Sequence, residues 1–130
     1  MSSLTLERCI YTYLDDDIHE FIFVDDSNTA FDEFLSDLKQ ILAMHIESGE
    51  TLRVLIDARH GMPSLMYAAE CTKGCFDSYQ NLTCRIAFLN QPDSLLTLAA
   101  ALIGLITGSN TGKFSATFRR DEALSWLVSE

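Results

Sequence analysis

Apolar and polar residues alternate at the start of this chain and then recur at helical spacing. Residues 9–14 alternate, the aspartates 15–17 interrupt the run, and apolar residues resume at 21–24, which predicts a β-hairpin with an acidic turn. Polar capping residues then precede a segment, 31–46, in which apolar side chains recur every three or four positions. This spacing predicts a first helix, and Gly49 is suited to end it in a left-handed conformation.

The rest of the chain continues as strands and helices in turn. Residues 52–56 form an almost unbroken apolar run, which is typical of a central parallel strand covered on both faces. Later segments have the pattern of a helix at 64–80, a strand at 84–89, a helix at 93–106, a strand at 114–118 and a short helix opening at 121. The predicted order is β-β-α-β-α-β-α-β-α, an α/β fold in one domain over residues 1–130. We expect Trp126, on the last helix, to be largely buried against the final strand.

Composition narrows the classes of partner. The chain carries 19 acidic and 9 basic side chains, a formal net charge of −10, so its average surface repels phosphate backbones and we expect no nucleic-acid partner. The longest nearly uncharged apolar run, 95–106, is shorter than the ~20 residues that a membrane span requires. Residues 1–20 lack the basic start and apolar core of a signal peptide, which favours a cytoplasmic protein.

Three features of the chain together resemble a known bacterial family. They are Asp57 at the end of the central strand, the strand residues 85–88, and Phe114 and Phe118 followed by the helix 121–127. In these features the chain resembles the SpoIIAA-like proteins of the STAS fold (sulfate transporter and anti-sigma-factor antagonist), over roughly residues 8–128. The resemblance implies a STAS-like mixed sheet of four to five strands, with helices mainly on one side, and it implies no reaction.

The same resemblance implies two roles, both without catalysis. Anti-sigma-factor antagonists of this fold are regulatory, protein-interaction modules switched by phosphorylation of a serine at the start of the helix after the central strand, and Ser64 lies at about that place. The antagonists carry an Asp-Ser pair followed by a small residue and glycine, whereas Ser64 lies between Pro63 and Leu65. Related domains bind apolar small molecules, so the alternative is a carrier or sensor of a small hydrophobic, lipid-like ligand.

The loop after the central strand is the predicted contact site for a partner or ligand. Such sites lie beyond the carboxyl ends of parallel strands, and here the loop carries Asp57, Arg59, His60, Met62 and Ser64. Asp57, His60 and Ser64 are the residue types of a hydrolase triad, but a base on so short a loop can rarely lie between the other two, and no G-x-S-x-G motif is present. We therefore expect no enzyme, with Ser64 capping the second helix and His60 in solvent. Asp57 is expected to pair with a loop amide or with Arg59.

The apolar positions of the predicted third helix cover nearly every direction around its axis, which is more than one face on a sheet can bury. The expected apolar groove or interface comprises Leu65, Met66, Leu98, Leu102, Ile103 and Ile106. A second subunit, a bound apolar ligand or the neighbouring helix 64–80 would cover its other side. Of these three we favour a homodimer.

The cysteines offer one candidate metal site. Cys71 and Cys75 share a face of the predicted second helix, and Cys84 with His60 could complete four zinc ligands. Paired C-x-x-C spacing is lacking, and cysteine commonly acts as a small core residue. We therefore expect free thiols, no metal and no cofactor.

Two further motifs are expected to be structural. Segment 108–113 has three residues between its glycines and leads into a strand, whereas a phosphate-binding loop has four and opens a helix. His19 and His45 lie at a strand start and near a helix end, where they are expected to be structural or solvated. Neither motif indicates catalysis.

Overall fold

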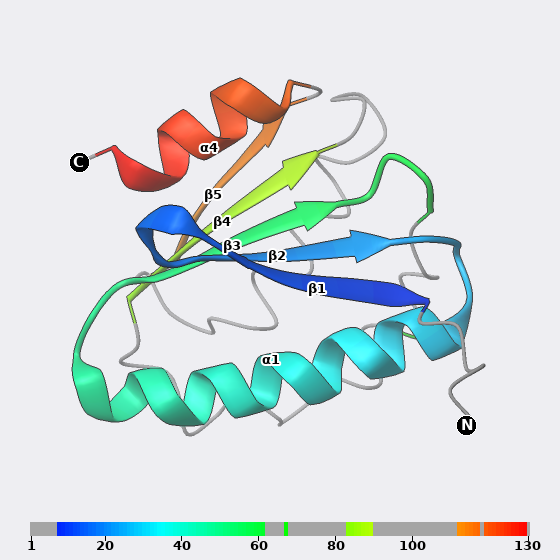
Figure 1. Cartoon of the computed structure of the whole chain (residues 1–130), viewed down its shortest axis with the longest axis horizontal. Coiled ribbons are helices and arrows are strands. Elements are labelled where there is room, and N and C mark those ends of the chain that lie inside the picture. The colour runs from blue at the N-terminus through cyan, green and yellow to red at the C-terminus, as the bar shows by residue number, and fades with distance from the viewer. Residues whose placement is uncertain (1–7, 62–66, 68–82, 90–111, 118, 130) are drawn as a thin grey trace.

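The computed structural model describes residues 8–61, 67, 83–89, 112–117 and 119–129, with the backbone alone for 46–48 and 112–116. In this part of the chain a five-stranded sheet lies between two α-helices (Figure 1). The elements are β1 (Cys9–Leu14), a 3-10 turn η1 (Asp15–Asp17), β2 (Ile18–Phe23), α1 (Asn28–Ser48), β3 (Leu52–Asp57), β4 (Cys84–Leu89), β5 (Gly112–Thr117) and α4 (Arg120–Val128).

The sheet is mixed and its strands follow chain order, β1-β2-β3-β4-β5. β1 runs antiparallel to β2, and the other neighbouring pairs are parallel. This arrangement confirms the predicted hairpin and the central parallel position of β3. Asp16 and Asp17 turn the hairpin with positive φ angles of 66° and 58°, a conformation that aspartate adopts more readily than most residues.

Helix α1 begins and ends as its sequence predicts. The Ser27 hydroxyl accepts a hydrogen bond from the Ala30 amide at 3.2 Å, which satisfies one of the unpaired amides of the first turn. Gly49 closes the helix at φ 72° and donates its own amide to the carbonyl of His45. No helix in the described ranges is long and apolar enough to cross a membrane.

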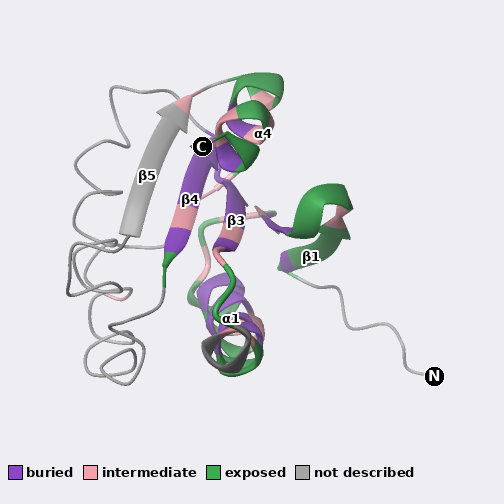
Figure 2. Cartoon of the chain, turned by 90° about the vertical axis from the view of Figure 1, so that its left-hand side faces the viewer, coloured by how far each residue is buried: buried purple, intermediate pink, exposed green. Residues whose placement is uncertain are grey.

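Side chains of the sheet alternate between two core layers, one under each helix. Figure 2 colours most of β3 and β4, and parts of α1 and α4, as buried. On one face, α1 packs against Phe21, Phe23, Val54, Ile56, Ile86 and Phe88. On the other face, α4 packs against Ile18, Leu55, Ala87 and Leu89. The two described helices therefore cover opposite faces of the sheet.

The sequence predicts that most helices lie on one side of the sheet. Two of the helices that this prediction needs, 64–80 and 93–106, lie outside the described residues apart from Tyr67. Tyr67 is helical and packs against the core layer under α1. Its ring meets that of Phe31 edge-on, with centroids 6.2 Å apart, and its hydroxyl donates to Asp32. The single described point of the predicted second helix therefore lies on the α1 side.

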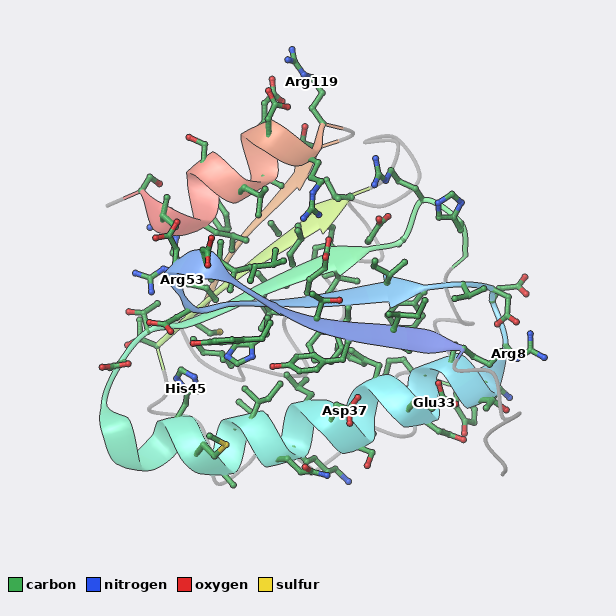
Figure 3. All side chains as sticks on the ribbon, viewed as in Figure 1. Arg8, Glu33, Asp37, His45, Arg53 and Arg119 are labelled. Atoms are coloured by element: carbon green, nitrogen blue, oxygen red, sulfur yellow. The ribbon has the colours of Figure 1, made fainter. Side chains whose placement is uncertain are left out.

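The chain end differs in detail from its prediction. Ala123 and Leu127, one turn apart, are the fully buried residues of α4, whereas Trp126 is only partly buried. The Arg85 guanidinium of β4 lies 4.4 Å from the centre of the Trp126 ring, so a charged residue of β4 covers this ring. Arg53 also ties α4 to the sheet, because its Nε donates to the Leu127 carbonyl at 2.9 Å (Figure 3). An arginine at this carbonyl supplies a hydrogen-bond donor to one of the carbonyls that have no partner within the last turn of the helix.

Candidate functional site

The carboxyl end of β3 is built around a buried ion pair. Asp57 is 3% exposed, and both of its carboxylate oxygens accept hydrogen bonds from Arg59. The amide and Nε of Arg59 donate to Oδ1 at 3.1 and 3.0 Å, and Nη2 donates to Oδ2 at 2.9 Å. Burial raises the pKa of Asp57, but the hydrogen bonds and charge of Arg59 outweigh it and hold that pKa below its ordinary value. The sequence predicts a loop amide or Arg59 as the partner of Asp57, and Arg59 supplies both its amide and its side chain.

The loop after Asp57 is held at two further points. The Ala58 amide donates to the Leu89 carbonyl at 2.9 Å, which joins the loop to β4. A Cβ at Gly61 would lie 2.3 Å from the carbonyl carbon of Asp25, so only glycine allows this approach to the loop after β2. The backbone of residues 58–61 is therefore fixed although the loop lies at the surface.

Within this fixed loop, Arg59 and His60 are exposed. His60 lies in solvent, as its sequence context predicts. Met62 and Ser64 lie outside the described residues, as do the predicted groove or interface residues Leu65, Met66, Leu98, Leu102, Ile103 and Ile106. The structure thus brings together Asp57 and Arg59 and leaves His60 on the surface beside them.

A second buried carboxylate on the same face of the sheet has no local signal in the sequence. Glu20 of β2 is 4% exposed and pairs with Arg120, the first residue of α4. The charge of Glu20 also acts on Arg59 and helps to raise its pKa. Glu20 follows His19 in a strand whose other residues are apolar, and its partner Arg120 lies 100 positions later in the sequence. No pattern within a few residues of Glu20 therefore indicates the pair.

A pocket of about 420 Å³ lies at the other end of the parallel strands, between the β1–β2 hairpin and the last turns of α1. Its lining residues are Tyr11, Tyr13, Asp17, His19, Ile41, Met44, His45 and Glu50. His19 is 7% exposed, and its ring meets that of His45 edge-on with centroids 5.5 Å apart. His19 is therefore structural and not solvated, and the packing of the hairpin against the end of α1, which buries it, cannot be seen in the local pattern.

The environment of His19 favours its neutral form. Burial lowers the pKa of His19, the neighbouring His45 lowers it further, and the carboxylate of Asp17 opposes this shift. The Tyr11 hydroxyl and the Nδ1 atom of His19 are 2.7 Å apart and share a hydrogen bond. A phenol is the better donor of the two groups, so we assign its proton to this bond and the remaining imidazole proton to Nε2.

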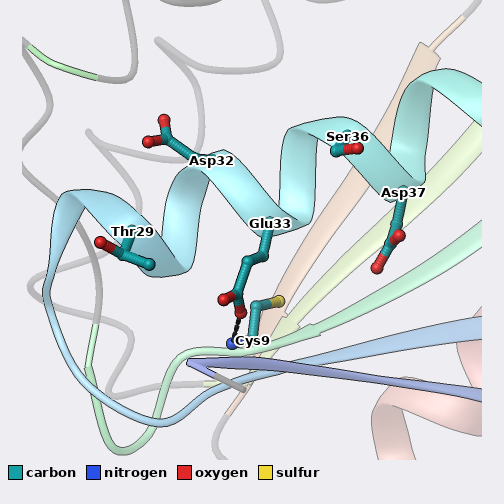
Figure 4. Close-up of a pocket in the computed structure, with 6 residues that line it drawn as sticks. All are labelled: Cys9, Thr29, Asp32, Glu33, Ser36 and Asp37. Carbon is teal, nitrogen blue, oxygen red and sulfur yellow. Dashed lines mark hydrogen bonds between the residues drawn. The ribbon is translucent and has the colours of Figure 1, made fainter. Parts of the chain in front are cut away.

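A second pocket, of about 390 Å³, lies between β1 and the first half of α1 (Figure 4). It is lined by Cys9, Thr29, Asp32, Glu33, Ser36 and Asp37. Glu33 accepts hydrogen bonds from the amides of Arg8 and Cys9 at 2.7 and 2.8 Å, so its carboxylate fastens the start of β1 to α1. Glu33 at the centre of this acidic pocket therefore has a structural role.

The described residues give no support to a metal centre. In these ranges no three His, Cys, Asp or Glu side chains are grouped so that they could hold a metal ion. Cys9 and Cys84 form no disulfide, and burial raises the pKa of the Cys84 thiol to about 11, which keeps it protonated at neutral pH. Cys71 and Cys75 lie outside the described residues.

Three comparisons with known proteins identify no relative of this chain. No family model, no curated protein and no solved structure matches the chain.

Proposed function

We propose that this chain is a non-enzymatic regulatory or protein-interaction module of the SpoIIAA-like type, which acts in the cytoplasm. Its contact surface is the loop that follows β3. The observation that carries this function is a loop whose side chains are exposed while its backbone is fixed by Asp57, Ala58 and Gly61. A surface that is ordered before it meets a partner loses little conformational entropy on binding.

The position of the loop supports the same function. It lies beyond the carboxyl end of the central strand of a parallel set, where α/β sheets commonly place their binding sites. The charge of Arg59 is balanced by Asp57, so this pair adds no net charge to the loop on a chain whose net charge is −10. An acidic segment of a partner would therefore be repelled less at this loop than by the average surface.

The hydrogen bonds of Asp57 weigh against a hydrolase. A triad carboxylate must orient the imidazole of the base. Here both oxygens of Asp57 accept from Arg59, so Asp57 supports the loop and is not available to orient His60. A homodimer formed through the apolar positions of 95–106 belongs to this proposal as well.

The test compares two glycine variants in the native host. Gly61→Ala would push the loop away from Asp25, whereas Gly49→Ala, at φ 72° with open space around it, strains the end of α1 and leaves the loop intact. Each tagged variant is purified gently and examined by native mass spectrometry. We expect a discrete protein complex with the wild type and with Gly49→Ala that is lost with Gly61→Ala. Equal complexes with both variants would contradict the loop as the contact surface.

The carrier or sensor of a small hydrophobic molecule stays a prediction, because the residues expected to line its groove lie outside the described residues. The same native mass spectra distinguish this carrier from the protein-interaction module. A mass increment of a few hundred daltons on the isolated chain, in place of a protein complex, would favour the carrier over the interaction module.

A further inference from the structure

The pocket at the hairpin end of the sheet has an aromatic wall. Tyr11 and Tyr13 project from the same face of β1 toward His19, with ring centroids 5.9 and 5.1 Å from that of His19. His45 closes the wall from the last turn of α1 (Figure 3), and Ile41 and Met44 complete its apolar side. One face of the Tyr11 ring is stacked on His19 at an interplanar angle of 20°, and the faces of tyrosine rings carry negative potential.

The carboxylates in the described lining come from Asp17 and Glu50. Among the described lining residues there is no lysine or arginine. Asp17 also accepts a hydrogen bond from the Tyr13 hydroxyl, which holds the more exposed of the two tyrosines in place. Since burial lowers the pKa of His19, this ring stays neutral at neutral pH and does not oppose a cation.

His19 supplies a polar atom that the fold does not satisfy. Its Nδ1 is bonded to the Tyr11 hydroxyl, whereas its Nε2 is buried and has no hydrogen-bond partner among the described residues. A buried donor without a partner is unfavourable and is uncommon in folded proteins. An acceptor brought into this pocket by a ligand would remove that penalty.

We propose that the pocket formed by Tyr11, Tyr13, Asp17, His19 and His45 binds a small organic cation that also carries an oxygen acceptor, such as a quaternary amino alcohol. The cation lies against the tyrosine faces beside the carboxylates of Asp17 and Glu50, and the oxygen accepts a hydrogen bond from Nε2 of His19. This site is independent of the loop after β3, which lies at the opposite end of the parallel strands.

The experiment is an amide NMR titration of the full chain with three probes. Choline carries both the quaternary cation and a hydroxyl, tetramethylammonium carries the cation alone, and 3,3-dimethyl-1-butanol is the neutral isostere of choline. We expect choline to shift the amides around Tyr11, Tyr13, His19 and His45. Tetramethylammonium should bind the same amides more weakly, and the neutral isostere roughly ten-fold more weakly than choline.

Two charge variants distinguish binding of the cation in the pocket from its general attraction to a protein with a negative net charge. Asp17→Asn and Asp121→Asn each remove one negative charge, and asparagine tolerates the positive φ of residue 17. Only Asp17→Asn should weaken choline binding, by several-fold. Absence of choline-dependent shifts at the pocket, equal affinity for the neutral isostere, or equal loss in both variants would each overturn the cation site.

Discussion

Replacing Arg59 by leucine should leave Asp57 as a buried carboxylate without a charged partner, held only by the amide of residue 59. Removal of one partner from a buried ion pair destabilises proteins by about 3–5 kcal/mol. The Arg59 side chain is 32% exposed, so water can reach part of the site and we expect a loss of about 2–3 kcal/mol at neutral pH. Urea unfolding of the wild type and the variant measures this difference.

The pH dependence of that loss gives a more specific signature. In the wild type the pKa of Asp57 is below its ordinary value of 3.8, so the pair contributes stability above that pH and the contribution is lost as the pH falls through the folded-state pKa. Arg59→Leu removes the side-chain hydrogen bonds and the charge of residue 59 but keeps its amide bond to Asp57 and the neighbouring His60. Burial is the largest single influence on Asp57, so we expect its pKa to rise and the folded variant to be favoured as the pH falls. The difference between the two proteins should therefore shrink between neutral pH and about pH 4.5.

Two controls accompany this comparison. Arg119→Leu removes an arginine whose side chain is 67% exposed and should change the free energy of unfolding by less than about 0.5 kcal/mol. Asp57→Asn combined with Arg59→Leu removes both charges and should be more stable than Arg59→Leu alone. A loss in Arg59→Leu that matches Arg119→Leu, or that is the same at both pH values, would refute the idea that Asp57 depends on Arg59.

Three further predictions concern the fold and the assembly. Leu127→Ala should destabilise the chain by about 2–5 kcal/mol, whereas Trp126→Phe, which keeps a ring under Arg85, should lose less than about 1.5 kcal/mol, and the reverse order in urea unfolding would contradict the packing of α4. Ser27→Ala should lose about 1 kcal/mol of stability and Ser27→Asp almost none, so equal thermal stability of both variants would count against the cap. Leu102→Glu should yield a monomer by light scattering, and a wild type that is already monomeric at high micromolar concentration would remove the homodimer.

Features that depend on neighbouring residues could be predicted from the sequence. The hairpin, the cap at Ser27, the end of α1 at Gly49 and the apolar β3 each follow from spacing within a few positions. The pairing of Asp57 with Arg59 belongs to this class too, because the two residues are two positions apart and a strand end leaves them on one turn.

Features that depend on long-range contacts could not be predicted in this way. Glu20 contacts Arg120 only because α4 packs back on the sheet, and no residue close to Glu20 in the sequence indicates that its carboxylate is buried. His19 is buried because the hairpin folds against the end of α1 beside His45. The contact of Gly61 with Asp25 likewise joins two loops that the parallel sheet brings side by side, so its importance is visible only in three dimensions.

The most direct test of the binding loop is site-specific photo-crosslinking in living cells of the native host. A photoreactive amino acid is placed at His60, on the fixed loop, or at Lys39, on the exposed side of α1. We predict one discrete protein adduct from position 60 that is absent from position 39 and disappears when Gly61→Ala is added. A position 60 that gives no adduct, or the same adducts as position 39, would contradict the assignment of this loop as the contact surface.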